Sequence, residues 1–301
     1  MTRQLAAVRY YLHLVIRDFE AKWHEVHNGI TNYVTLLDQV RRARKSGEPV
    51  CIVTFNYDRM IEAALGSLGI SITAMSHYIE NPEFKLFKLH GSVNWGRRVR
   101  APFDSVNRGR SVWDLIKELI QEADKLELSS DYELVSEFPI GKLVTVPLFP
   151  ALAIPVVTKR GYECPDEHLE CLKALLPQTR VILTIGWRGT ESHFLSMLAQ
   201  GVNGNEILLA AVTGTNRDSK AVIEALRAAS IPIKGYRFGK GFTDFVINRH
   251  AESFCGEALT RYDLEESLKN WIIGQEDEPT IESDFDPRLG SSDFDPRSRE
   301  K

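Results

Sequence analysis

Apolar residues at helical spacing open the chain and give way to a continuous apolar run near residue 50. Between Leu5 and Arg44 they recur every three or four positions, which predicts two helices. The turn "SGEP" ends the second helix, and "VCIVTF" at residues 50–55 is typical of a strand buried on both faces of a parallel sheet. A further helix is predicted from Asp58 onward.

The second half of the chain repeats a rhythm of strand and helix. The predicted helices "HLECLKALL", "ESHFLSMLAQGV" and "RDSKAVIEALRAASI" alternate with the predicted strands "RVILTIGW" and "EILLAAVTG". Such alternation is typical of an α/β protein with a doubly wound parallel sheet. Two shorter strands are predicted near "ITAM" at residues 72–75 and in "FKLFKLHG" at residues 84–91.

Two segments depart from this rhythm. Residues from about 97 to 143 are predicted to form an inserted helical and loop segment, because "VWDLIKELIQEADKL" has helical period and lies between polar stretches. After about Gly274 the chain becomes acidic and repeats "SDFDPR", with too few apolar residues to bury a core. We therefore expect one domain over residues 1–275 and a disordered acidic tail over residues 276–301.

Composition narrows the classes of protein further. A 301-residue chain with 43% hydrophobic residues can fill a large core, and a formal net charge of -4 gives no general attraction to nucleic acid or to an anionic membrane. Neither is expected as a direct partner. Four cysteines without a CxxC pair, and no signal peptide at the amino end, fit a reducing cytoplasm. The longest apolar run, residues 143–157, is too short for a membrane span and contains three prolines.

Polar residues lie at the carboxyl ends of the predicted strands, where open parallel sheets bind ligands. Thr54, Asn56 and Asp58 follow the first strand in "TFNYD", although Asp58 alone could serve only as a helix N-cap. His90 and Gly91 end "FKLFKLHG". A single histidine at such a place is more often structural than catalytic, and the glycine permits either close approach of a ligand or unusual dihedral angles.

The strand "RVILTIGW" ends in a glycine turn. Gly186 and Gly189 lead into a helix that is predicted to begin near Glu191, and a glycine turn at a helix N-terminus suits a phosphate or a ribose. Such a turn is weak evidence by itself. Arg188 is either a phosphate contact or a solvated arginine beside the helix start.

Taken in this order, the three segments resemble the sirtuin superfamily, and in particular the bacterial sirtuin-like NAD hydrolases of antiphage defence, over most of residues 50–250. The resemblance implies a Rossmann-like fold and NAD as substrate. It implies that Asn56 orients water against the anomeric carbon and that His90 hydrogen-bonds or deprotonates a ribose hydroxyl. The further NAD contacts that it implies are Thr54, Asp58, Gly91, Gly186, Trp187, Arg188 and Thr213.

One departure from the family's pattern concerns the phosphate loop. The family begins with a strand and a glycine-rich loop, and nothing before Asn56 resembles them. Either Met1 is an internal start, or this is a divergent member that holds the pyrophosphate otherwise. In the first case we expect an open sheet flank beside the strand at residues 50–55 and weak NAD binding.

Other departures concern metal and the late glycine turn. The deacylating sirtuins carry two CxxC pairs on a zinc module, whereas Cys164 and Cys171 lie seven apart with His168 between them, and we expect no metal. The family's usual glycine-serine pair is replaced by Gly186 and Trp187.

The leading hypothesis is an enzyme that hydrolyses NAD to nicotinamide and ADP-ribose in antiphage defence. The alternative is a non-catalytic module that binds NAD or ADP-ribose, or a scaffold within a defence complex. Protein deacylation is less favoured, since it would need an acyl-lysine groove that the sequence does not reveal. A second copy of the chain and a partner defence protein are both candidates for a macromolecular partner.

Overall fold

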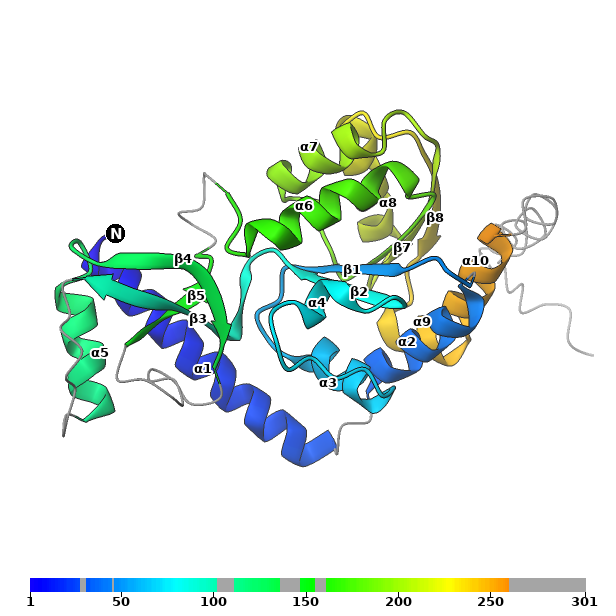
Figure 1. Cartoon of the computed structure of the whole chain (residues 1–301). Coiled ribbons are helices and arrows are strands. Elements are labelled where there is room, and N and C mark those ends of the chain that lie inside the picture. The colour runs from blue at the N-terminus through cyan, green and yellow to red at the C-terminus, as the bar shows by residue number, and fades with distance from the viewer. Residues whose placement is uncertain (28–30, 45, 102–110, 136–146, 155–160, 260–301) are drawn as a thin grey trace, which may run out of the picture. The chain divides into compact units, whose positions relative to one another are not determined.

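The computed structural model describes residues 1–27, 31–44, 46–101, 111–135, 147–154 and 161–259, and the elements are labelled in Figure 1. The first half contains α1 (Arg3–His27), α2 (Asn32–Ala43), β1 (Val50–Thr54), α3 (Met60–Ser67), α4 (His77–Glu80), β2 (Phe84–Lys88), β3 (Gly91–Ala101), α5 (Val112–Gln121) and β4 (Glu127–Leu134). The second half contains β5 (Leu148–Leu152), α6 (Asp166–Leu175), β6 (Val181–Ile185), α7 (Ser192–Gly201), β7 (Ile207–Val212), α8 (Asn216–Ala228), β8 (Ile233–Phe238), α9 (Gly241–Ile247) and α10 (His250–Leu259).

Two parallel sheets form the α/β part of the chain. β1 pairs with β2, and β7 lies between β6 and β8. Helices α7 and α8 connect β6 to β7 and β7 to β8, as parallel strands require. This arrangement is compatible with a Rossmann-like fold. Within the described residues β1 has a partner strand on one side only.

The strands with the most apolar surroundings carry the main core. Every residue of β2 but one is buried, and so is every residue of β7 but one. The same core includes side chains from the helices that pack on these strands, such as Leu65, Leu172, Phe194, Leu198 and Leu226. β7 is a continuous apolar run, as expected of a strand covered on both faces, whereas β2 contains two lysines, of which Lys88 is fully buried.

The segment from about 97 to 143 contains more than the predicted helix and loops. α5 is helical as expected, but β3 continues to Ala101 and pairs antiparallel with β4 and β5. Arg98 and Arg100 are exposed while Val99 is buried, which is the period of two that a strand produces. Two register shifts between β3 and β4 interrupt that pattern. Residues 102–110 and 136–146 of the segment lie outside the described part.

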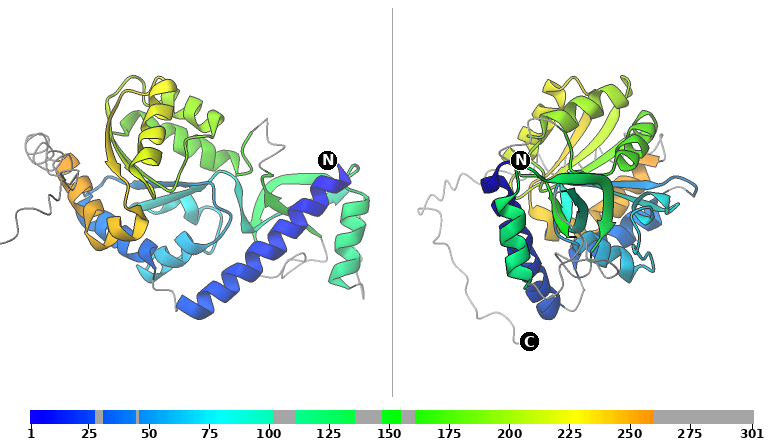
Figure 2. Two further views of the ribbon diagram at one scale, coloured as in Figure 1. Left: turned by 180° about the vertical axis from the view of Figure 1, so that it is seen from behind. Right: turned by 60° about the vertical axis from the view of Figure 1, so that its left-hand side comes forward.

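Helix α1 packs on this antiparallel sheet and on α5, as Figure 2 lets the reader follow. A second core between them contains Ala6, Tyr10, Val99, Leu115, Leu119 and Phe149. The Tyr10 hydroxyl donates to the carbonyl of Leu148 at 3.3 Å, and a ring nitrogen of His13 lies 2.8 Å from the carbonyl of Val93. Among the described residues, no helix has the length and apolar content that a membrane span needs.

The prediction of a strand at residues 72–75 is wrong. This stretch forms no strand, and α4 follows it directly. Thr73 makes local contacts instead, because its backbone amide and its hydroxyl both lie within 3.3 Å of the His77 ring nitrogen Nδ1. Such local side-chain hydrogen bonds compete with ladder pairing. The acidic tail predicted at residues 276–301 lies outside the described residues.

Candidate functional site

The carboxyl ends of β1, β2 and β6 meet around the ring of Phe55. The ring centroid of Phe55 lies 4.9 Å from that of His90, 6.3 Å from that of Trp187 and 5.4 Å from that of Phe194. Tyr57 stacks on His90 at 6.4 Å with an interplanar angle of 29°. We call these five residues the ring cluster. The structure thus brings all three predicted motifs together: the turn after β1, the His-Gly pair and the glycine turn after β6.

The turn after β1 is held by its own polar groups. The backbone amide of Asn56 donates to the Thr54 hydroxyl at 3.1 Å. Asn56 itself is exposed. The Asp58 carboxylate accepts the backbone amide of Met60 at 3.0 Å, at the start of α3. The N-cap of α3 is Arg59, one residue after the predicted N-cap Asp58, and the Asp58 carboxylate supports the first turn of the helix from the preceding position. Whether it also contacts a ligand stays a prediction.

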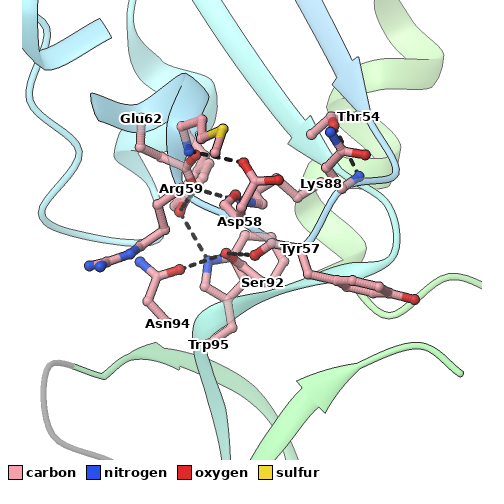
Figure 3. Close-up of polar contacts among 12 residues, drawn as sticks. Thr54, Tyr57, Asp58, Arg59, Glu62, Lys88, Ser92, Asn94 and Trp95 are labelled. Carbon is pink, nitrogen blue, oxygen red and sulfur yellow. Dashed lines mark hydrogen bonds and ion pairs between the residues drawn. The ribbon is translucent and has the colours of Figure 1, made fainter. Parts of the chain in front are cut away.

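A buried ion pair lies beneath this turn (Figure 3). Lys88, at the end of β2, has a fully buried side chain whose ammonium group donates to the Asp58 carbonyl and, at 2.9 Å, to the Glu62 carboxylate. The Tyr78 hydroxyl donates to the same Glu62 oxygen at 2.9 Å and accepts from the Trp95 indole at 3.1 Å. Burial raises the pKa of Tyr78 well above its usual value, so this hydroxyl stays a donor. The network fixes the end of β2 to the turn after β1.

Helix α1 also contributes to the position of the turn. The Glu20 carboxylate accepts the backbone amide of Arg59 at 2.6 Å and the Arg59 Nε at 2.8 Å, and only 1% of the Glu20 side chain is exposed. A buried carboxylate needs such charge-assisted partners to offset the loss of water. The start of α3 is thereby fixed from two sides, by α1 and by β2.

His90 has an environment that suits proton transfer near neutral pH. It is partly buried, and that burial lowers the pKa of His90, while the nearby Glu191 carboxylate opposes the shift. The imidazole is therefore neutral at pH 7 and can accept a proton. Glu191 was not among the predicted site residues.

Gly91 is required by packing rather than left open for a ligand. Its φ is +83°, and a Cβ atom added there would lie 1.9 Å from the Ala151 carbonyl oxygen of β5. The unusual dihedral angle that the sequence allowed is confirmed. The group that approaches this backbone closely is the β5 chain. The NAD contact at Gly91 stays a prediction.

The glycine turn after β6 faces open space at its first glycine. Gly186 is exposed with φ +64°, and a Cβ atom added there would meet nothing within 4 Å. Gly189, in contrast, packs against α8, since its added Cβ would lie 2.9 Å from the Ala225 Cβ. The Trp187 indole donates to the Glu191 carboxylate, and the Arg188 side chain is exposed. The Gly186 amide donates to the Val212 carbonyl at 3.0 Å, so the exposed Arg188 guanidinium is the donor that this turn offers to an anionic ligand.

Thr213 lies at the end of β7, as predicted, but its hydroxyl is engaged locally. Oγ1 donates to the Thr215 carbonyl at 2.7 Å and lies 2.8 Å from the Ser219 hydroxyl. Thr215 in turn caps α8 by accepting the Asp218 amide at 3.1 Å. The observed contacts of Thr213 therefore support the turn between β7 and α8.

Sequence reasoning overlooked three polar residues of the site. Lys88 carried a signal, since it shares one face of the strand with the apolar residues Phe84 and Leu86, and a lysine is rarely buried there without a paired carboxylate. Glu20 and Glu191 carried none, because their partners are distant in sequence or belong to a turn whose path the sequence leaves open. In the described part no group of three or more His, Cys, Asp or Glu side chains is arranged to hold a metal ion.

Comparisons of the chain with profiles of known protein families, with curated proteins and with solved structures found no match. The sirtuin resemblance therefore depends on the motif residues alone.

Proposed function

We propose that this chain hydrolyses NAD at the bond between nicotinamide and ribose, releasing nicotinamide, ADP-ribose and a proton. The observation that carries the proposal is the meeting of the Asn56 turn, His90 and the Gly186 turn at the carboxyl ends of three strands. Open parallel sheets bind nucleotides at this edge.

The chemistry fits the residue types. Nicotinamide leaves as a neutral molecule from a cationic ring, so the reaction needs support for an oxocarbenium-like ribose more than it needs a strong acid. In the proposal, the exposed Asn56 amide orients the attacking water, and neutral His90 accepts a proton from the water or from a ribose hydroxyl. The aromatic faces of Phe55 and Trp187 supply stacking surfaces for a planar ring.

The pyrophosphate is assigned to the turn after β6. Gly186 is exposed with open space beside it, and Arg188 supplies a guanidinium that can pair with phosphate oxygens. A role as an effector in antiphage defence is the biological setting that the motif resemblance favours. A module that binds NAD without cleaving it is the competing outcome.

The test is to incubate the purified chain with NAD and to quantify nicotinamide and ADP-ribose by chromatography. Asn56→Ala and His90→Ala should each lower turnover, His90→Ala by roughly two to four powers of ten, while the circular dichroism spectrum is retained. His77→Ala, a histidine change on α4, serves as the matched control and should leave turnover unchanged. Saturable NAD binding without nicotinamide release would favour the binding module, and turnover that survives in a folded Asn56→Ala variant would refute the catalytic assignment.

A further inference from the structure

Most of the ring cluster is only partly buried. Phe194 of α7 is buried, and the other four residues are partly exposed: Phe55, Tyr57, His90 and Trp187. Phe194 lies edge-on to both Phe55 and Trp187, with interplanar angles of 77° and 80°. The Phe55 and Trp187 rings lie nearly parallel to each other, at 21°. Within the described part of the chain, the cluster therefore presents adjoining aromatic surfaces above one buried ring.

A carboxylate is attached to this aromatic surface. The Glu191 Oε2 atom accepts the indole N–H of Trp187, four residues earlier in the chain. Glu191 is partly buried, and among the described residues no lysine, arginine or histidine forms an ion pair with it. Burial removes part of the water around a carboxylate, so a nearby cation stabilises its charged form. Glu191 thus places a negative charge beside the rings without a counter-ion from the described part of the chain.

The two basic residues nearest to Glu191 do not neutralise this charge. Burial lowers the pKa of His90, so its imidazole is neutral at pH 7, although Glu191 opposes the shift. Arg188 is exposed, and the proposed function assigns its guanidinium to the phosphate oxygens of the dinucleotide. A positively charged ligand group beside Glu191 therefore meets a neutral histidine and an unpaired carboxylate.

Aromatic faces and a carboxylate together favour one kind of ligand. The face of an aromatic ring attracts cations, because its π electrons give that face a partial negative charge. A flat aromatic cation gains ring stacking in addition to this attraction. An ammonium group would gain the attraction alone, and an uncharged ring would gain the stacking alone. The combination of Glu191 with the rings of Phe55 and Trp187 therefore suits a planar cation best.

We propose that Glu191, Phe55 and Trp187 bind the positively charged pyridinium ring of the oxidised dinucleotide and so determine which ligand this site accepts. The inference rests on the proposed function for the identity of that ligand. The pyridinium charge exists only in NAD, whereas the dihydropyridine ring of NADH is neutral and not aromatic. The site therefore selects NAD over NADH. Cleavage turns the bound cation into neutral nicotinamide, so the product is held more weakly than the substrate. We name these three residues the cation site.

The test uses N1-methylnicotinamide, a pyridinium without a glycosidic bond, and nicotinamide as its uncharged counterpart. Two-dimensional NMR of the isotope-labelled full chain follows the indole N–H signals of the five tryptophans, and Trp187→Phe identifies the signal of Trp187. That signal should shift saturably with N1-methylnicotinamide, and the affinity for nicotinamide should be about tenfold lower. The indole of Trp95 is buried and donates to the Tyr78 hydroxyl, so its signal should not move.

Two variants separate the charge of Glu191 from its hydrogen bond. Glu191→Gln keeps an acceptor for the Trp187 indole and removes the charge. It should lower the affinity for N1-methylnicotinamide to that for nicotinamide and leave the affinity for nicotinamide unchanged. Glu170→Gln makes the same change of charge on α6, where 70% of the Glu170 side chain is exposed. This matched control should bind both compounds as the wild type does, and unchanged signals from the other tryptophans show that each variant is folded.

Three results would overturn the cation site: a Trp187 signal that does not shift up to about 100 mM N1-methylnicotinamide, equal affinities for the charged and the uncharged compound, and a preference that survives in Glu191→Gln. Methylguanidinium that binds as tightly as N1-methylnicotinamide would overturn the assignment to a pyridinium.

The proposed function is tested separately, by nicotinamide release from NAD. Charge-selective binding without release would keep the cation site and refute the hydrolysis. Release without charge-selective binding would refute the cation site alone.

Discussion

Replacing Lys88 by Met should destabilise the fold by about 3–5 kcal/mol, the usual cost of removing one partner from a buried ion pair. Lys88 is fully buried and only 11% of the Glu62 side chain is exposed, so the remaining carboxylate would keep the Tyr78 hydroxyl as its partner but lose its counter-ion. The Asp58 carbonyl would lose its lysine donor as well. Against a typical unfolding free energy of about 5–15 kcal/mol, this is a large fraction.

Urea unfolding at pH 7, followed by tryptophan fluorescence and circular dichroism, measures the effect. Lys88→Met combined with Glu62→Gln removes both charges while it keeps an acceptor for Tyr78, and it should be more stable than Lys88→Met alone. Lys220→Met is the matched control, because its partner Glu224 lies 3.7 Å away and both side chains are more than half exposed. That change should cost less than about 0.5 kcal/mol.

Two results would refute the reasoning about this pair. One is a loss below about 1 kcal/mol for Lys88→Met, a value typical of exposed pairs. The other is a double variant whose loss equals the sum of the two single losses, because the charges would then act independently. If the pair also positions the turn after β1, the double variant should remain folded and release nicotinamide more slowly than the wild type.

Three further predictions follow from single residues. Gly91→Ala should cost about 3 kcal/mol or more in a melting experiment, because φ is +83° and the new methyl group would lie 1.9 Å from the Ala151 carbonyl oxygen; an unchanged melting temperature would contradict this. Burial lowers the pKa of His13 to about 4, so the unfolded chain binds more protons between pH 6.5 and 4, and about 3 kcal/mol of stability should be lost as the pH falls through that window. His13→Gln should remove this part of the pH dependence in urea titrations, and an identical slope in both proteins would exclude His13 as the cause. Glu191→Gln should move the acid limb of nicotinamide release to lower pH, since the Glu191 carboxylate raises the pKa of His90; a limb that stays in place would separate Glu191 from the catalytic histidine.

The parts of the fold that the sequence predicted are those in which local pattern and tertiary burial agree. The strand β7 is a continuous apolar run that is buried at every position but one, and the helices α7 and α8 on either side of it in the sequence keep one apolar face, so periodicity alone located them. The strands β3 and β4 were not predicted, because bulges interrupt the alternation of their side chains. The stretch at residues 72–75 was wrongly predicted as a strand. Its short alternation of apolar residues is typical of a strand, but in the described part of the chain no strand lies beside it to pair with.

Only those residues of the candidate site that directly follow a predicted strand could be predicted from the sequence. Asn56 and His90 lie where the motifs placed them, and the Phe55 ring confirms that the two turns after β1 and β6 are neighbours. The sequence could not reveal that Glu20 reaches the turn after β1 from a helix 39 residues earlier. Contacts of this kind depend on the packing of α1, which no local pattern encodes.

These long-range contacts explain how a polar turn stays fixed on a strand that has only one partner. Among the described residues β1 is bonded to β2 alone, and it is half covered, so this pairing by itself would hold its carboxyl end weakly. The end is held instead by charge-assisted hydrogen bonds, from Lys88 to the Asp58 carbonyl on one side and from Arg59 to Glu20 on the other. The turn that carries Asn56 is therefore held by side chains from α1 and β2 as well as by the pairing of β1 with β2.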